Sequence, residues 1–522
     1  MKTPFLFFII CSFSFSEELP IGLTLEEKTR LHEIYSMGRQ TEPPAGPIRN
    51  IAEYERMQGV LIRYPFGISV DLISEIAEDT KVYCLVSESQ QNSAINVLNS
   101  GGVNIENVEF INGSTDSYWT RDYGPWWVVD GDNKMSVVDF TYNRPRPNDN
   151  DAPLKISDYF DVPFYASDII HAGGNYMTDG YGISASSDLI FQENQVADSI
   201  LLQLMNSYYG IDTYHVIDDP NNTYIDHIDC WGKYLSPTKV LIRDVPNSHP
   251  QFDQIEATST YFASSLNAWN EPWDVYRIWT PNNEPYTNSL IINEKVLVPL
   301  TGGSSDVAAL TVYENAMPGY EVLGFTGSWE STDALHCRTK GIPDLQMIQI
   351  FHNPLNNNLV PSGEGYLVQA EIKDLSDTGL ESDSMKIFWR RPNESEWSST
   401  MLEKTQDDVS EAIWSGGIPA ITDTSVLHYF IQAADSSGRV EKNPIGGWHT
   451  FLALPTDACN EWIVGDLNNT GNLDIFDILG ISDNIISQEL TGICADSVSD
   501  INNDGQSTLI DVILLVNLVM NE

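Results

Sequence analysis

One imidazole lies between two carboxylates in the stretch Thr223-Tyr224-Ile225-Asp226-His227-Ile228-Asp229-Cys230-Trp231, among branched and aromatic residues. In an extended chain, successive side chains point to opposite faces. His227 and Asp229 would then point the same way, about 7 Å apart. An imidazole and a carboxylate aimed at one place suit a cationic, planar substrate that also exchanges protons. The same pair is common in structural strands, so its meaning depends on the rest of the chain.

The composition limits the class of partner. Lys and Arg number 27 against 74 Asp and Glu, for a formal net charge of −47 over 522 residues. This charge repels nucleic acids and anionic membranes, so we expect neither as a partner. It suits a secreted protein and calcium binding. With 42% apolar residues the chain can build large cores, and its length suits about two to four domains.

The N-terminus has the features of a signal peptide. A charged residue precedes the apolar run 4–15, and Ser14-Phe15-Ser16 offers a small-x-small cleavage site. The run is too short to span a bilayer, and no later stretch of about 20 residues is apolar enough. Cys11 would suit a lipoprotein, but Ile10 before it is a poor match. We expect residues 1–16 to be a cleaved signal and the protein to be secreted, extracellular or cell-surface associated.

Periodicity divides the remaining chain into four parts. Residues 17–51 are a polar, Pro-rich lead-in, and residues 52–345 alternate short apolar strands with helical stretches, which predicts an α/β domain of repeated architecture. Residues 346–455 contain about seven short alternating strands, typical of an immunoglobulin-like β-sandwich. Residues 456–522 hold a repeat. The strands expected in the α/β domain are 59–63, 82–87, 137–143, 240–243 and 289–299, and the helices are 70–78, 193–209 and 252–270.

The repeat in residues 456–522 consists of two calcium-type loops, each followed by an apolar helix at 475–486 or 509–520. Oxygen-bearing side chains recur at alternate positions, and a Gly at position 6 allows the sharp turn that Ca²⁺ loops need. The candidate ligands are Asp466, Asn468, Thr470, Asn472 and Asp477 in the first loop, and Asp500, Asn502, Asp504, Gln506 and Asp511 in the second.

These two loops resemble a type I dockerin, because Asp occupies position 12 and each loop has one helix. The resemblance implies structural Ca²⁺ and a cohesin-like partner. Cys459 and Cys494 lie in the same region, and a disulfide between them is plausible in a secreted protein.

Cys337 lies in different surroundings from the other cysteines. It follows a Gly/Ser/Asp-rich loop and stands between His336 and Arg338. Nearby positive charge lowers the pKa of a thiol and raises its thiolate fraction. Cys337 is therefore the candidate nucleophile. Nothing in the α/β domain has the paired Cys/His spacing of a metal site.

Several motifs of the α/β domain occur in a distinctive order. They are Trp119-Thr120-Arg121-Asp122-Tyr123-Gly124-Pro125, Gly173-Gly174-Asn175, His227-Ile228-Asp229, Thr287-Asn288-Ser289 and His336-Cys337. This order resembles the bacterial, Porphyromonas-type peptidylarginine deiminase and agmatine deiminase family over about residues 52–344. The resemblance implies a five-bladed α/β propeller of the pentein type, which periodicity does not reveal.

The resemblance also implies a role for each motif residue. A guanidinium is a planar cation that binds carboxylates along its edges, and Asp122 and Asp229 match the two clamps. Cys337 matches the nucleophile and His227 the acid and base that protonates departing ammonia and then activates water. Asn288 matches a residue that orients the nucleophile. No cofactor is expected in catalysis.

The choice of substrate depends on Arg144-Pro145-Arg146. In secreted peptidylarginine deiminases two arginines at this place hold the α-carboxylate of a C-terminal arginine, and Arg suits such a bidentate grip. Trp119 and Tyr224 would line the site and stack on the substrate. We therefore expect conversion of peptidyl-arginine to citrulline and ammonia. The alternatives are agmatine deimination to N-carbamoylputrescine, with Arg144 and Arg146 pairing with acidic neighbours, and a non-catalytic assembly component that docks through its calcium repeats.

Overall fold

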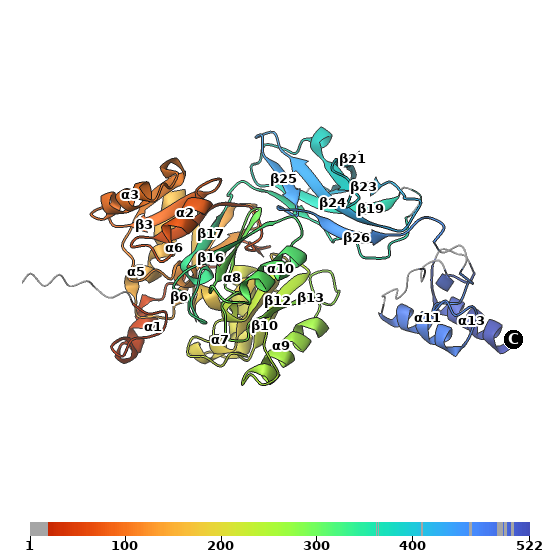
Figure 1. The fold of residues 1–522 in the computed structure, drawn as a ribbon, viewed down its shortest axis with the longest axis horizontal. Helices are drawn as coiled ribbons and strands as arrows, with labels where there is room; N and C mark the ends of the chain where they lie inside the picture. Colours follow the sequence, from red (N-terminus) through yellow and green to blue (C-terminus); the bar gives the residue numbers. More distant parts are fainter. Residues whose placement is uncertain are drawn as a thin grey trace, which may run out of the picture. The chain divides into compact units, whose positions relative to one another are not determined.

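The structure is a computed structural model that describes residues 19–361, 363, 365–408, 411–458, 462–487, 494, 498–502 and 506–521 (Figure 1). It has two compact units. The first ends at Asp344, except that Met317–Glu321 belong to the second. The signal peptide expected at residues 1–16 lies outside the described residues. The part of the chain that is described contains no helix with the length and apolar character of a membrane crossing.

The first unit is an α/β domain, as predicted. Its strands are β1 (Arg49–Asn50), β2 (Met57–Arg63), β3 (Lys81–Val86), β4 (Val108–Asn112), β5 (Trp126–Val129), β6 (Met135–Tyr142), β7 (Phe164–His171), β8 (Met177–Thr178), β9 (Ile183–Ser187), β10 (Thr213–Ile217), β11 (Gly232–Ser236), β12 (Lys239–Asp244), β13 (Asp274–Trp279), β14 (Leu290–Ile292), β15 (Lys295–Leu300), β16 (Glu321–Thr326) and β17 (Lys340–Pro343). Its helices are α1 (Ile34–Met37), α2 (Val70–Ile76), α3 (Gln91–Ser100), α4 (Thr120–Tyr123), α5 (Pro147–Asn150), α6 (Ala152–Phe160), α7 (Leu189–Glu193), α8 (Asp198–Tyr209), α9 (Phe252–Ser264) and α10 (Asp306–Ala316).

These strands form five small sheets within residues 49–343, a stretch that is described throughout. The strand orders are β1-β5-β6-β7, β10-β9-β8, β11-β12-β13, β14-β15-β16 and β17-β2-β3-β4. In several sheets an antiparallel pair is followed by a helix and a third, parallel strand, as in β5-β6-β7 and β11-β12-β13. β17 pairs with β2, so the last strand of the domain joins its first sheet. The five blades of a propeller remain a prediction.

The helices bury apolar stripes against these sheets. On α8, Leu201, Met205 and Tyr208 recur at helical spacing and are buried in a cluster with Val138 and Ile169 of the neighbouring strands. The repeated helix-on-sheet unit therefore comes from apolar periodicity alone, which explains why no residue-by-residue repeat is visible in the sequence.

Two expected elements differ from the structure. The single strand expected at 289–299 is a hairpin of β14 and β15, because Asn293 adopts a φ of 53° and turns the chain. The helix expected at 193–209 is divided into α7 and α8. Asn194 ends α7, since its side-chain amide donates hydrogen bonds of 2.8 Å to the carbonyls of Ile190 and Ile170.

The second unit contains two antiparallel sheets, β18-β19-β23-β22 and β21-β20-β24-β25, with β26 also paired to β24. Both sheets contribute to one core, which includes Tyr366 and Val368 from one and Ile387, Tyr429 and Ile431 from the other. This is a β-sandwich, and its immunoglobulin-like character remains a prediction. The strands are β18 (Ile348–Phe351), β19 (Tyr366–Asp374), β20 (Lys386–Arg390), β21 (Ser398–Met401), β22 (Glu403–Asp408), β23 (Glu411–Ile418), β24 (Ser425–Ala434), β25 (Val440–Asn443) and β26 (His449–Ala453).

The C-terminal part of this unit has the two predicted helices, α11 (Ile475–Ser487) and α13 (Leu509–Asn521). A small cluster that contains Leu467, Ile481 and Leu515 forms their core. Cys494 is disulfide-bonded, whereas Cys459, the partner suggested by the sequence, lies outside the described residues.

Candidate active site

Five short turns, each just before a strand of a different sheet, carry the motif residues. α4 precedes β5, 3-10 turns precede β8, β11 and β17, and a turn at Asn288 precedes β14. The residues so placed are Asp122, Gly174, His227, Asp229, Asn288 and Cys337. Apart from the glycine, each of these residues is at most 4% exposed. A repeated fold unit therefore explains why motifs scattered over the sequence meet at one place.

Asn288 holds the turn that carries Cys337. Its side-chain Nδ2 donates to Cys337 Sγ at 3.2 Å, and its Oδ1 accepts from the Cys337 backbone N–H at 3.3 Å. The Asn288 carbonyl also accepts from the backbone N–H of His336 at 3.0 Å. These contacts hold the thiol and its turn in place; the role that the resemblance implies for Asn288 remains a prediction.

Asp122, His227 and Asp229 face one another across Gly174. Asp122 Oδ1 lies 3.6 Å from His227 Nδ1 and accepts from the Gly174 N–H at 3.2 Å. A Cβ on Gly174 would stand 2.6 Å from Asp122 Oδ1, 2.7 Å from His227 Nδ1 and 3.3 Å from Asp229 Oδ2. Only glycine fits there. Within the described residues, Asp122 Oδ2 and both ring nitrogens of His227 lack a hydrogen-bond partner, as expected of groups that wait for a substrate.

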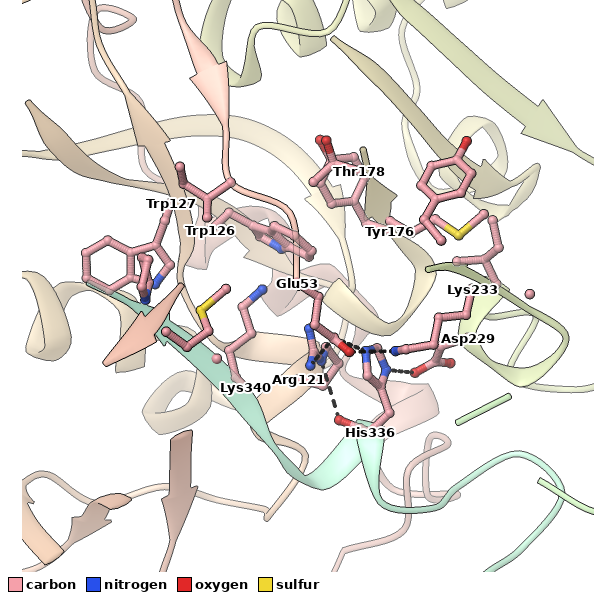
Figure 2. Close-up of a pocket in the computed structure, with 18 residues that line it drawn as sticks. Glu53, Arg121, Trp126, Trp127, Tyr176, Thr178, Asp229, Lys233, His336 and Lys340 are labelled. Carbon is pink, nitrogen blue, oxygen red and sulfur yellow. Dashed lines mark hydrogen bonds and ion pairs between the residues drawn. The ribbon is translucent and has the colours of Figure 1, made fainter. Parts of the chain in front are cut away.

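His336 and Glu53 form a second layer of side chains that the sequence analysis missed. His336 Nδ1 lies 2.7 Å from Asp229 Oδ2, and its Nε2 lies 2.6 Å from Glu53 Oε2. Glu53 is itself held by Arg121 and Lys233, each at 2.7 Å (Figure 2). The layer fixes Asp229, whose other neighbour is Cys337 Sγ at 3.6 Å. The position of His336 beside Cys337 was the available sequence signal, but nothing in the sequence pointed to Glu53.

Burial and mutual repulsion set the protonation states of the empty site. Burial raises the pKa of Asp122 to about 8, and the neighbouring Asp229 carboxylate adds to the shift. Burial lowers the pKa of His227 to about 4. Burial alone would raise the pKa of Asp229, but the hydrogen bond and charge of His336, together with the nearby His227 and Arg121, lower it. Near pH 7 these groups therefore comprise a neutral imidazole of His227, a protonated Asp122 and an ionised Asp229.

The prediction that His336 and Arg338 lower the pKa of the Cys337 thiol is wrong. His336 is turned toward Glu53 and Asp229, and Arg338 is paired with Asp333 through its Nε at 2.9 Å. Burial instead raises the pKa of the Cys337 thiol well above its usual value, helped by the carboxylates of Asp229, Asp333 and Asp122. The thiolate therefore needs a cation from outside, and a guanidinium substrate would supply one.

The two arginines expected to bind a carboxylate have different surroundings. Arg146 is 1% exposed and is held by Glu27 of the lead-in, with Nε to Oε1 at 2.7 Å and Nη2 to Oε2 at 3.2 Å. Its Nη2 also donates to the carbonyls of Pro20 and Gly22. The Glu27 carboxylate thus pairs with Arg146 through Nε and Nη2, while within the described residues Arg146 Nη1 has no hydrogen-bond partner.

Arg144 remains available at the site. Its Nε donates to the Ile21 carbonyl at 3.0 Å and its Nη1 to the Asn143 carbonyl at 3.2 Å. Within the described residues no partner accepts from its Nη2. The positive charge of Arg144 acts on the pKa values of both Asp122 and His227, which places the guanidinium near these two side chains. Two backbone carbonyls thus hold Arg144 in place while one edge stays open.

The aromatic residues expected to line the site also separate. Trp119 is buried beside the turn of Asp122, with its ring 5.5 Å from the Arg338 guanidinium carbon. Tyr224 is 68% exposed and packs against Gly22 instead. The extended conformation expected here is interrupted, because Asp226 has a φ of 54° and Ile228–Cys230 form a 3-10 turn. Tyr224 therefore lies at the surface, away from His227.

The first calcium-type loop has features that suit the predicted ion. Asp466 and Asp477 are fully buried, and Gly471 has a φ of 81° at the sharp turn. Their carboxylates accept backbone N–H groups of the loop, including those of Gly471 and Leu467. Asn468, Thr470 and Asn472 follow at the remaining positions. In the second loop Asp504 lies outside the described residues. Among the described residues, no three His, Cys, Asp or Glu side chains are grouped so that they could hold a metal ion; the predicted calcium ligands include amide and hydroxyl groups as well.

Comparisons with known proteins agree on the first unit. The sequence profile of the Porphyromonas-type peptidyl-arginine deiminase family matches residues 67–343, more than half of the chain. A protein named "Putative agmatine deiminase" from Mycoplasma mycoides is 24% identical over 300 residues, which are 49% of this chain and 80% of that protein. One of the same name from Legionella pneumophila is 22% identical over 296 residues, covering 51% of this chain and 83% of that protein.

Solved structures show the same fold. The agmatine deiminase of Enterococcus faecalis is 17% identical, with a TM-score of 0.51 over 58% of this chain and 99% of that one. The "Putative Arginine Deiminase from Porphyromonas gingivalis" is 17% identical, with a TM-score of 0.52 over 57% of this chain and 98% of that one.

Proposed function

Since this chain belongs to the Porphyromonas-type peptidyl-arginine deiminase family, we propose that it hydrolyses the guanidinium group of an arginine-type substrate to a ureido group and ammonia. One observation carries this proposal: the carboxyl groups of Asp122 and Asp229 are buried together beside the Cys337 thiol. Two carboxylates held out of water call for a cation between them. A guanidinium fits because it presents N–H donors along its edges.

The reaction follows from the charges of the site. Binding of the cation favours ionised Asp122 and the Cys337 thiolate, and His227 accepts the thiol proton. The thiolate adds to the guanidinium carbon, His227 returns the proton to the departing nitrogen, and ammonia leaves a cationic thiouronium on Cys337. His227 then takes a proton from water as its oxygen adds to the same carbon. The hydroxyl proton passes to the departing sulfur, so that Cys337 leaves as the thiol, and His227 gives its proton to ammonia or solvent. The neutral ureido product binds weakly between two carboxylates.

The substrate that this site favours carries a carboxylate near its guanidinium. Arg144 supports this, because its open edge lies near Asp122 and His227 and a guanidinium grips a carboxylate through two parallel bonds. A C-terminal arginine of a peptide has such a carboxylate. We therefore propose a peptidyl-arginine deiminase with preference for C-terminal arginine.

Agmatine is the second candidate, for two reasons. Curated relatives carry the agmatine deiminase name. In addition, Glu193 lies close to Arg144, and its Oε2 is buried without a hydrogen-bond partner among the described residues. Its other oxygen accepts from Asn143 Nδ2 at 2.7 Å. A carboxylate in this position could hold the amine of agmatine, but Arg144 would repel that amine.

The remaining features of the chain are part of the same proposal. The five sheets would be the blades of a pentein-type propeller around the catalytic groups. The predicted signal peptide, the immunoglobulin-like sandwich and the dockerin-like repeats suit a secreted enzyme that docks through a cohesin-like partner. Asp466, Asn468, Thr470, Asn472 and Asp477 would hold one structural Ca²⁺ in the first repeat.

An assay of ureido products tests the proposal. The substrates are a peptide ending in a free-acid arginine, the same peptide amidated, and agmatine. We expect turnover of the free-acid peptide to exceed that of the other two. Fastest turnover of agmatine would favour the second candidate, and no product from any of the three would leave only the non-catalytic assembly function.

A further inference from the structure

A second cavity lies behind the catalytic groups, on the far side of the layer made by His336 and Glu53. Its cavity volume is about 50 Å³, several times the roughly 10–15 Å³ that one water needs, so it admits only a small ligand. Cys337, Asp122, His227 and Asn288 are not among its lining residues. Figure 2 shows Lys340 within it, reaching toward the ring of Trp126 and away from the network of Glu53.

The ammonium of Lys340 has no hydrogen-bond partner in this cavity. Lys340 is only 4% exposed, and its Nζ lies 3.2 Å from the centre of the Trp126 ring. No described residue accepts a hydrogen bond from it. A cation–π contact stabilises a desolvated ammonium by far less than a buried charge loses on leaving water. An anion bound beside Lys340 would therefore stabilise its ammonium.

The charges of the lining point to the same ligand class. Glu53 forms ion pairs with Arg121 and Lys233, whereas Lys340 points away from this network. Burial and the Arg121 guanidinium lower the pKa of Lys340 well below its usual value. A carboxylate bound beside Lys340 would stabilise its ammonium form and pair with it.

The remaining walls are apolar and aromatic, and polar groups among them lack acceptors. Met57, Ile51 and Pro343 contribute aliphatic surface beside Trp126 and Trp127. Within the described residues, Nε1 of both tryptophans has no acceptor. The chemistry suits a small molecule with one anionic end and an apolar body.

We propose that this cavity binds a small monocarboxylate with an apolar body, whose carboxylate pairs with Lys340. Its position gives such a ligand a direct connection to catalysis, because Glu53 forms its wall and also holds His336, which holds Asp229. Ligand and substrate would then change each other's affinity by the same factor.

Calorimetric titration of the full-length protein with butyrate tests the site, with uncharged butyramide as the control ligand. We expect one butyrate per chain, no binding of butyramide, and binding ~10–100-fold weaker in Lys340→Met, since a charge-assisted bond is lost. Arg144→Ala should bind butyrate like the unaltered protein. Butyrate binding that is lost in Arg144→Ala and kept in Lys340→Met would overturn the proposal and place the carboxylate in the substrate site. No binding to the unaltered protein, or equal binding of butyramide, would also overturn it.

A crystal structure with butyrate keeps the test decisive if Lys340→Met does not fold. A carboxylate within hydrogen-bond distance of Lys340 Nζ is the expected result. A cavity without butyrate at a saturating concentration would refute the inference.

Discussion

Replacement of Arg144 by alanine should remove the preference for a C-terminal arginine. In the structure two backbone carbonyls hold Arg144 while its Nη2 stays open near Asp122 and His227. A charge-assisted hydrogen bond to a substrate carboxylate contributes roughly 1.5–3 kcal/mol. Since about 1.4 kcal/mol corresponds to tenfold in rate, Arg144→Ala should lower kcat/KM by ~10–100-fold for the free-acid peptide. The amidated peptide lacks the carboxylate, so its kcat/KM should hardly change.

Arg146→Ala is the matched control for this measurement. Arg146 is engaged by Glu27 rather than by the site, so its loss should leave the ratio of free-acid to amidated turnover unchanged. It should instead lower the free energy of unfolding by ~3–5 kcal/mol, because the Glu27 carboxylate stays buried without its partner. Ureido formation gives the ratio, and thermal unfolding gives the stability.

The opposite outcome would refute this reasoning. If Arg146→Ala removed the free-acid preference and Arg144→Ala kept it, Glu27 would be an occupant that substrate displaces. If the unaltered enzyme turned over both peptides equally, neither arginine would bind substrate, and agmatine would become the leading candidate.

Three further predictions concern the site and the repeats. Gly174→Ala should lower kcat/KM by at least ~100-fold without loss of fold, since the new Cβ enters the space between Asp122 and His227; near-normal ureido formation would contradict this geometry. The value of kcat/KM should rise with pH up to about pH 8, because Asp122 must lose its proton to bind a cation and burial raises the pKa of Asp122 to about 8. His227 stays neutral over this range, since its pKa is lowered to about 4. A kcat/KM that falls between pH 6 and 8 would argue against this assignment. Calcium should protect residues 456–522 of the full-length protein from proteolysis, because the ligand carboxylates repel one another without the ion. A cleavage pattern that a chelator leaves unchanged would count against the calcium loops.

The sequence was sufficient to predict which residues meet at the candidate site. Asp122, His227, Asp229, Asn288 and Cys337 each lie in a short motif, and the structure brings all of them together. Their catalytic roles remain predictions. The α/β alternation was predictable for a local reason, since apolar periodicity is a property of neighbouring positions.

What the sequence did not predict depends on contacts between distant positions. Glu53 reaches His336 across 283 residues, and Glu27 reaches Arg146 across 119. Nothing local marks either carboxylate as a partner. The pKa of Cys337 was predicted in the wrong direction for this reason, because the charges next to it in sequence are directed to other partners in space.

The error at Tyr224 has another origin. A pattern of alternating residues was interpreted as a strand, but the positive φ of Asp226 and the 3-10 turn after His227 break the alternation. Asn and Asp tolerate the left-handed conformation, so a single Asp can end an extended stretch. His227 and Asp229 still meet at the site because Gly174 leaves space between them, not because they share the face of a strand.

The covalent role of Cys337 is the central claim, and mass spectrometry of acid-quenched enzyme during turnover tests it most directly. With the free-acid arginine peptide, we expect an adduct of the substrate, less ammonia, on the peptide fragment that contains Cys337. Cys337→Ala should fold, form no adduct and give no ureido product. Ureido formation by a well-folded Cys337→Ala protein would contradict the account.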